Sequence, residues 1–241
     1  MMKLTWTRLY RYELLFLYIL ISSSACTQDM YQQRRAAMVQ NQLIPRGITD
    51  EKVLDAMQKV ERHLFVPPDV VSQAYRDGPL PIGYGQTISQ PYIVAYMTQI
   101  LDLEKSDKVL EVGTGSGYQA AVLGEICDSV YTIEIVPQLG QRSKLLLAEL
   151  GYEGVKVKVG DGYQGWKEYA PYDAIIVTCA PTHVPEPLQE QLNEGGRMII
   201  PVGEKYVQEL VIMKKKNGKL RKNSVLPVLF VPMVDDGGKT Y

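Results

Sequence analysis

From Lys108 onward, the chain alternates between short β-branched runs and segments suited to helices. The β-branched runs are Val109–Val112, Val130–Ile135, Val155–Val159, Ala174–Val177 and Arg197–Ile200, and the helical segments between them are Tyr118–Ile126, Pro137–Leu150 and Pro185–Asn193. Parallel strands can be joined only by a connection that crosses over a face of the sheet, and that connection is usually a helix. The alternation therefore predicts a mainly parallel sheet with helices on both faces.

The residues that follow predict a hairpin at one edge of this sheet. Glu209–Lys214 and Val225–Val231 have the composition of strands, and Asn217-Gly218 between them is a common hairpin turn. The run Lys214–Lys216 beside the turn is typical of a solvated edge strand. With these two strands the sheet has seven, and the predicted fold class is a doubly wound α/β domain with a mainly parallel sheet.

The residues before Lys108 predict a helical lobe followed by a loop. In residues 31–75, apolar side chains recur at three-to-four spacing, as in helices: Met38, Leu43, Val53, Leu54, Met57 and Val60. Segment 78–85 is so rich in glycine and proline that it predicts a structured loop without a regular element. We therefore divide the chain into a helical N-terminal lobe at 31–75 and the α/β domain at 76–234.

Residues 1–26 have the layout of an export signal. In order, the positive, apolar and small residues are Lys3, Arg8 and Arg11, then Leu14–Ile21, then Ser22–Ala25. Such an order is typical of a signal peptide, and the apolar run is well short of the roughly 20 residues that span a bilayer. Cys26 directly follows Ser-Ser-Ala, which resembles a lipoprotein processing site. We expect a periplasmic or lipid-anchored protein, attached to the membrane only through its N-terminus, and a cytoplasmic one if the leader is not used.

Composition argues against two kinds of partner. The chain has 26 Lys and Arg against 27 Asp and Glu, so its formal net charge of -1 provides no overall positive field for nucleic acid. The cysteines Cys26, Cys127 and Cys179 show neither the paired spacing of a zinc site nor the density of a disulfide framework. We expect neither a metal ion nor a nucleic-acid partner.

A glycine-rich turn lies between the first β-branched run and the helical segment after it. Val109-Leu-Glu-Val-Gly-Thr-Gly-Ser-Gly117 has glycine at every second position after the strand, where backbone can approach a ligand closely. NAD and FAD domains also use such a turn, but their fingerprint has glycine where this chain has Tyr118. Glu111 would repel a pyrophosphate and would suit the cationic methionine end of S-adenosylmethionine.

Two further acids lie at the ends of the next two predicted strands. A carboxylate at Glu134 can accept hydrogen bonds from both ribose hydroxyls. Asp161, in Gly160-Asp-Gly162, can accept a hydrogen bond from the adenine amino group. Taken alone, each acid is better explained as a turn or helix-cap residue. Acids at three successive strand ends, however, predict a nucleoside-binding site.

Five blocks of sequence together resemble the protein-L-isoaspartate O-methyltransferase family, over about residues 35–233. They are Tyr84–Tyr92, Val109–Gln119, Gly160–Tyr163, Ala170–Val177 and Gly195–Gly203, in the order and spacing of the family. The block Gly85-Gln-Thr-Ile-Ser-Gln-Pro91 is specific to it. The resemblance implies the Rossmann-like fold of class I S-adenosylmethionine-dependent methyltransferases. It also implies methyl esterification of L-isoaspartyl carboxylates in damaged proteins, which initiates their repair, and it leaves open whether D-aspartyl carboxylates are accepted.

The resemblance also implies which residues form the site. Ser89 is the active-site hydroxyl, and Thr87, Ser89 and Pro91 contact the substrate. The implied cofactor residues are Ile88, Glu111, Gly113, Gly115, Gly117, Glu134, Asp161 and Gly162. The implied partners are isoaspartyl-containing proteins and peptides, and we expect a monomer. Val234 stands where the family usually has a threonine in the pocket wall, so the contribution of the tail is open, and the leader has no counterpart in this usually cytoplasmic family.

Sequence features argue against three alternative functions. An amine or nucleobase methyltransferase commonly carries an Asn/Asp-Pro-Pro-aromatic motif after the fourth strand, where this chain has Thr178-Cys-Ala-Pro181. Tyr118 and Glu111 disfavour an NAD-dependent oxidoreductase. A non-catalytic nucleoside-binding protein of the cell envelope is disfavoured by the intact block around Ser89.

Overall fold

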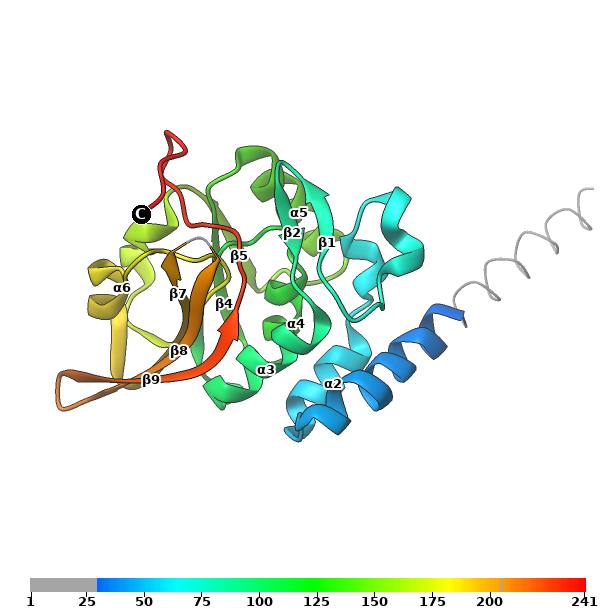
Figure 1. Cartoon of the computed structure of the whole chain (residues 1–241), viewed down its shortest axis with the longest axis horizontal. Coiled ribbons are helices and arrows are strands. Elements are labelled where there is room, and N and C mark those ends of the chain that lie inside the picture. The colour runs from blue at the N-terminus through cyan, green and yellow to red at the C-terminus, as the bar shows by residue number, and fades with distance from the viewer. Residues whose placement is uncertain (1–29, 205) are drawn as a thin grey trace, which may run out of the picture.

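One large sheet forms the centre of the molecule. The structure, a computed structural model, describes residues 30–204 and 206–241, so the predicted leader and Cys26 lie outside the described residues. Within them, a seven-stranded sheet has the order β5-β4-β3-β6-β7-β8-β9, and a separate two-stranded sheet pairs β1 with β2 (Figure 1). No helix in these two ranges is long and apolar enough to cross a membrane.

The large sheet has the predicted doubly wound topology. Its strands are β3 (Lys108–Val112), β4 (Ser129–Glu134), β5 (Val155–Val159), β6 (Tyr172–Val177), β7 (Leu192–Glu204), β8 (Val207–Lys216) and β9 (Lys219–Val228). β3 lies between β4 and β6 and is parallel to both, while β8 and β9 are antiparallel. After β3 the chain builds outward to β5 and then crosses back to β6, so β3 and β6 flank the point at which strand order reverses. Ligands of open α/β sheets bind at that point, beyond the carboxyl ends of the strands.

Helices cover the two faces unequally. The α-helices after residue 50 are α2 (Glu51–Lys59), α3 (Pro91–Leu101), α4 (Tyr118–Ile126), α5 (Pro137–Glu149) and α6 (Glu186–Gln191). Buried side chains of α2 to α5 pack with Val109 and Val130 on one face, whereas Leu188 of α6 packs with Leu110 and Ile175 on the other. Alternate residues of β3 thus enter different cores, as expected of a strand that is buried on both faces.

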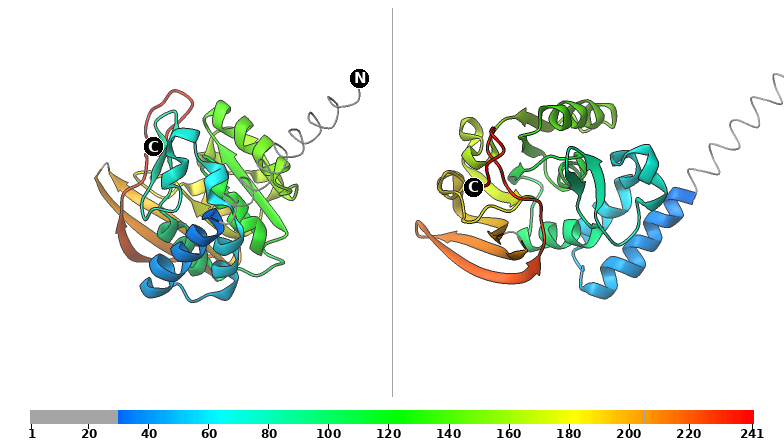
Figure 2. Two further views of the ribbon diagram at one scale, coloured as in Figure 1. Left: turned by 90° about the vertical axis from the view of Figure 1, so that its right-hand side faces the viewer. Right: turned by 45° about the horizontal axis from the view of Figure 1, so that its top comes forward.

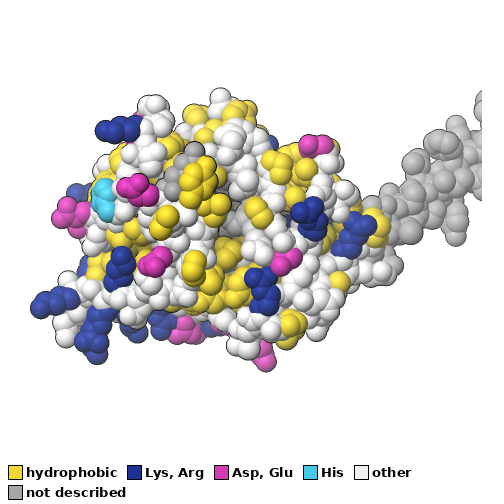
Figure 3. All heavy atoms as spheres, in the orientation of Figure 1, with side chains coloured by type: hydrophobic (Ala, Val, Ile, Leu, Met, Phe, Trp, Pro, Cys, Tyr) yellow, Lys and Arg dark blue, Asp and Glu magenta, His cyan; other side chains and the backbone are white. Residues whose placement is uncertain are grey.

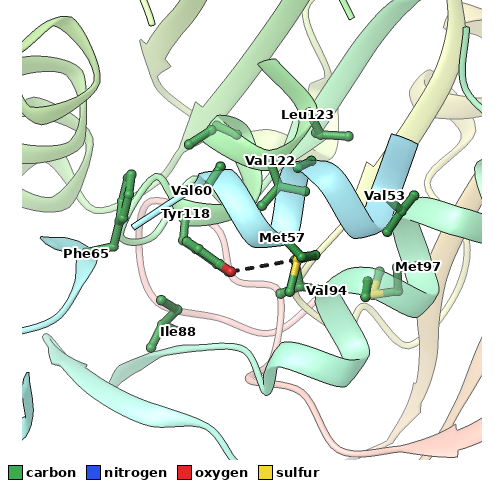
Figure 4. Close-up of a cluster of buried hydrophobic side chains, with 14 of the residues drawn as sticks. Val53, Met57, Val60, Phe65, Ile88, Val94, Met97, Tyr118, Val122 and Leu123 are labelled. Atoms are coloured by element: carbon green, nitrogen blue, oxygen red, sulfur yellow. Dashed lines mark hydrogen bonds between the residues drawn. The ribbon is translucent and has the colours of Figure 1, made fainter. Parts of the chain in front are cut away.

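The N-terminal lobe is helical, as predicted, and it packs against the face that carries α4. Residues 30–38 are helical, and short helical turns follow: η1 (Val39–Leu43), η2 (Ile44–Arg46), η3 (Arg62–Phe65) and η4 (Pro68–Gln73). The Asp50 side chain caps α2 by accepting hydrogen bonds from two backbone N–H groups. Met57 of α2 is fully buried, and its sulfur accepts a hydrogen bond of 3.7 Å from the Tyr118 hydroxyl (Figure 4). The lobe therefore supports the first residue of α4.

The segment at 78–85 is not the irregular loop that its glycines and prolines predict. β1 (Leu80–Gly83) and β2 (Gln86–Ile88) form an antiparallel hairpin, in which Leu80 and Ile82 are buried and the alternate residues are exposed. The turn uses positive φ angles of 92°, 55° and 70° at Gly83, Tyr84 and Gly85, which glycine adopts readily. Proline is tolerated here because a two-stranded sheet consists only of edges.

The edge strands are longer than their apolar patterns predict. β9 begins at Lys219, directly after the turn, because its polar first half pairs with the lysine-rich half of β8, for example Arg221 with Lys214. Lysine and arginine side chains project from this hairpin at the lower left of Figure 3. These residues are polar, so an apolar pattern cannot identify them as a strand. They are in a strand because their backbone pairs with that of the neighbouring solvated strand.

Candidate functional site

A cavity lies at the carboxyl ends of β3, β4 and β6. It has about 780 Å³ of empty space, part of it open to solvent. The residues around it come from the β1–β2 hairpin, the glycine turn, the ends of three strands and the segment after β9. Its lining includes Thr87, Ile88, Ser89, Glu111, Gly113, Gly115, Tyr118, Glu134, Gly162, Thr178 and Val234.

Glu111 is the least satisfied polar side chain in this cavity. It lies on the central strand β3 and is fully buried, and neither carboxylate oxygen has a hydrogen-bond partner among the described residues. Burial raises the pKa of Glu111 to about 8, because a charge loses its hydration inside the protein. A buried acid without a protein partner is destabilising unless a ligand supplies the missing donor or positive charge.

Glu134, by contrast, is held by the backbone. One carboxylate oxygen accepts a hydrogen bond of 2.6 Å from the Gly115 N–H, and the other accepts one of 2.9 Å from the Val136 N–H. Each oxygen keeps a further lone pair that a ligand hydroxyl could use. Glu134 and Glu111 line the same cavity, so the structure brings together the two acids that sequence analysis assigned to one nucleoside.

The glycine turn is shaped by a contact that only glycine permits. Gly113 has a φ of 103°, and a Cβ atom there would collide with the Thr178 Oγ1 atom. The Thr178 hydroxyl donates to the carbonyls of Val112 (3.1 Å) and Gly113 (2.8 Å). Thr178 thereby joins the turn after β3 to the end of β6. Thr178 was not among the site residues predicted from the sequence. The only feature that could have indicated it is its position directly after the fourth predicted strand.

The Ser89 hydroxyl is available to a ligand. Thr87 and Ile88, the last two residues of β2, line the cavity, and so does Ser89, which directly follows them before α3. In the part of the chain that the structure describes, no protein group forms a hydrogen bond with the Ser89 Oγ atom. The hairpin before it is anchored to α5, because an Arg142 nitrogen donates to the Ile82 carbonyl at 3.1 Å.

Three of the predicted site residues do not line the cavity. Pro91 is the first residue of α3, and Gly117 precedes α4 with a φ of 87°. Asp161 already has two partners, since it accepts hydrogen bonds from the Tyr163 N–H (2.9 Å) and the Tyr241 hydroxyl (2.6 Å). The adjacent Gly162 does line the cavity. Contact between Asp161 and a ligand stays a prediction, whereas its role as a cap of the following turn is observed.

The tail closes one side of the cavity. Val231, Pro232, Met233 and Val234 line it, and backbone hydrogen bonds join Met233 and Val231 to Ala180. In Figures 1 and 2 this red segment lies between the β1–β2 hairpin and α6. Val234 therefore contributes to the pocket wall with an apolar side chain in place of the hydroxyl that is usual in the family.

Comparisons with known proteins agree with this geometry. Residues 33–238 match the family model described as protein-L-isoaspartate(D-aspartate) O-methyltransferase. A protein-L-isoaspartate O-methyltransferase of Opitutus terrae is 54% identical over 224 residues, 92% of this chain and 96% of its own. One from Picosynechococcus is 53% identical, with 83% of this chain and 89% of its own covered.

Two solved structures extend the likeness to the fold. A protein-L-isoaspartate O-methyltransferase superposes with a TM-score of 0.77 at 32% identity, over 85% of this chain and 67% of its own. A putative enzyme of the same kind from Plasmodium falciparum, solved with S-adenosyl-L-homocysteine, has a TM-score of 0.72 at 28% identity, over 82% and 96% of the two chains. The family resemblance and the fold class are therefore confirmed, and this chain belongs to the protein-L-isoaspartate(D-aspartate) O-methyltransferase family.

Proposed function

We propose that this protein transfers the methyl group of S-adenosylmethionine to the free carboxylate of L-isoaspartyl residues in damaged proteins and peptides. The observation that carries the proposal is the single cavity that Glu111, Glu134 and the Ser89 hydroxyl share. The family supports it, and so does the relative solved with S-adenosyl-L-homocysteine, the product that remains after methyl transfer.

The residues that line the cavity suit S-adenosylmethionine in charge and hydrogen bonding. Glu111 is a buried carboxylate without a protein partner, and the amino group of the methionine end would supply both the donor and the positive charge. Glu134 would accept the ribose hydroxyls, while Gly113, Gly115 and Gly162 would leave room for the nucleoside. When bound, S-adenosylmethionine supplies a methyl group on a cationic sulfur, which an anionic oxygen can attack directly.

The acceptor needs no general base. A side-chain carboxylate has a reference pKa of about 3.9, so it is already ionised at neutral pH. The protein must orient this carboxylate and exclude water, effects that are together worth roughly 7–11 kcal/mol in well-aligned systems. The Ser89 hydroxyl donates a hydrogen bond to one carboxylate oxygen and leaves the other directed at the methyl group. The apolar side chains of Ile88 and Val234, which line the cavity, would help to exclude water from the reacting atoms.

The function is tested with paired peptides that differ only in an Asp or isoAsp linkage. Purified protein incubated with labelled S-adenosylmethionine should place a base-labile methyl ester on the isoAsp peptide only. Release of labelled methanol at alkaline pH measures that ester. Equal labelling of the two peptides, or an alkali-stable product, would contradict the proposed acceptor.

Replacement of Glu111 by Gln should strengthen the fold and weaken cofactor binding. The folded pKa is about 8 and the reference pKa is 4.5, so ligand-free wild-type protein loses stability as pH rises between these values, by up to about 1.4 kcal/mol per unit. Glu111→Gln has no such loss and should melt at a higher temperature at pH 8. Thermal unfolding from pH 6 to 9 measures the difference.

The same variant should remove a pH dependence of cofactor affinity. A cation binds the ionised acid, so wild-type affinity for S-adenosylhomocysteine should rise about tenfold per unit from pH 6 toward 8 and then level off. Calorimetric titration should find weak, nearly pH-independent binding for Glu111→Gln. Unchanged affinity in that variant would exclude Glu111 from the cofactor site.

Ser89→Ala should lower turnover much more than cofactor affinity. The hydroxyl contacts only the acceptor in this proposal, so we expect kcat to fall about 10- to 100-fold, which corresponds to one hydrogen bond to a charged group. The dissociation constant for S-adenosylhomocysteine should change less than about threefold. If the two quantities fell equally, Ser89 would be a structural residue. Ser106→Ala, at an exposed turn residue that does not line the cavity, is the control and should leave both quantities unchanged.

We also propose that the leader exports the protein, to the periplasm or to a lipid anchor at Cys26. The support is the order of positive, apolar and small residues in 1–26. Fractionation of cells that express the full chain, with mass measurement of its N-terminus, should find a shortened protein outside the cytosol. Full-length protein confined to the cytosol would refute export.

A further inference from the structure

Arg62 is a fully buried positive charge behind the active-site segment. It belongs to η3 of the N-terminal lobe, and no part of its side chain is exposed to solvent. Its Nε atom donates to the Ala74 carbonyl at 2.7 Å, and an Nη nitrogen donates to the Ser89 carbonyl at 2.8 Å. One guanidinium group thus joins the lobe to the residue whose hydroxyl faces the acceptor.

Among the described residues, no acidic side chain neutralises the charge of this guanidinium. Within the described ranges, no carboxylate forms a salt bridge with Arg62, and its other Nη nitrogen has no hydrogen-bond partner. Burial lowers the pKa of Arg62 to about 10, which leaves it charged at neutral pH. A buried, incompletely paired charge is destabilising, so packing alone does not account for arginine at this position.

Two of the residues that contact the guanidinium, Tyr118 and Ser89, line the cavity. The guanidinium carbon lies 4.8 Å from the centre of the Tyr118 ring, a cation–π contact, and Tyr118 lines the cavity beside the glycine turn. Ser89, between β2 and α3, also lines the cavity. Arg62 itself does not line the cavity, so its contact with the site runs through these two residues.

The other side-chain hydrogen bonds that hold the β1–β2 hairpin and the residues after it do not involve Ser89. Arg142 holds β1 at Ile82, and the Gln90 amide donates to Asp77 at 2.7 Å. Among the described residues, Arg62 is the one whose side chain bonds the Ser89 backbone. A planar guanidinium with two fixed donors sets the orientation of a carbonyl more closely than a single flexible ammonium can.

We propose that Arg62 is a positioning residue for methyl transfer, because it fixes the Ser89 backbone so that the hydroxyl meets the acceptor carboxylate. The assignment rests on the proposed function of Ser89. It predicts that Arg62 affects turnover only while residue 89 carries a hydroxyl. A residue that merely stabilised the lobe would affect turnover regardless of residue 89.

The test compares Arg62→Lys, Ser89→Ala and the double variant on the isoAsp peptide. Arg62→Lys keeps the charge but cannot hold both carbonyls in one plane. We expect kcat to fall about 10- to 100-fold, as for a small misplacement of a reacting group, while affinity for S-adenosylhomocysteine stays within about threefold. The double variant should be no slower than Ser89→Ala alone, within about twofold. Losses that multiply in the double variant would overturn the proposal.

Arg35→Lys is the matched control. Arg35 is also a buried arginine of the lobe, and its Nε atom donates to the Gln58 carbonyl at 2.6 Å, yet no contact to the Ser89 segment is observed. It should leave kcat within about threefold of wild type. An equal loss of kcat in both variants would show that lobe stability alone matters, against the proposal.

Amide hydrogen exchange provides a readout that does not depend on catalysis. Arg62→Lys should speed exchange at 88–90 relative to wild type, and Arg35→Lys should not. This comparison holds even if the wild-type protein methylates no isoAsp peptide, an outcome that would refute the proposed function separately. Unchanged exchange at 88–90 in Arg62→Lys would overturn the positioning role.

Discussion

A carboxylate without a protein partner in the middle of a parallel sheet is the constraint around which the site is organised. Glu111 lies on β3, with β4 and β6 on either side, and is fully buried without a hydrogen-bond donor among the described residues. Replacement by an apolar residue would remove the penalty of burying an acid. Its presence is understandable if a cationic ligand completes it, and the sulfonium nucleoside of this enzyme family is such a ligand.

In the proposed mechanism, the rest of the fold would place the acceptor opposite that ligand. The cavity lies at the carboxyl ends of β3 and β6, where strand order reverses, and Glu134 and the glycine turn line the side that we assign to the nucleoside. The β1–β2 hairpin brings Ser89 to the other side. Helical packing of the lobe supports both sides at once, since Met57 contacts Tyr118 and Arg62 contacts Ser89.

The sequence predicted the parts of the molecule that are encoded locally. β3 to β6 are short β-branched runs, and α4 begins and ends where its glycine turn and apolar pattern indicate. Contacts between residues far apart in the chain were not predicted, because no local pattern records them. The bond from Tyr241 to Asp161 spans 80 positions, and that from Thr178 to Gly113 spans 65. The β1–β2 hairpin was missed for another reason: its glycines and prolines resemble a loop, while its pairing depends on the buried Leu80 and Ile82.

The pKa of Glu111 with and without ligand tests the central claim most directly. Carbon-13 NMR of glutamate-labelled protein, with the resonance assigned by its loss in Glu111→Gln, follows this carboxyl group during a pH titration. The account predicts a midpoint near 8 without ligand and a fall of at least about one unit with S-adenosylhomocysteine, because a nearby positive charge favours the ionised form. An ordinary midpoint in the ligand-free protein, or one that ligand binding leaves unchanged, would contradict it.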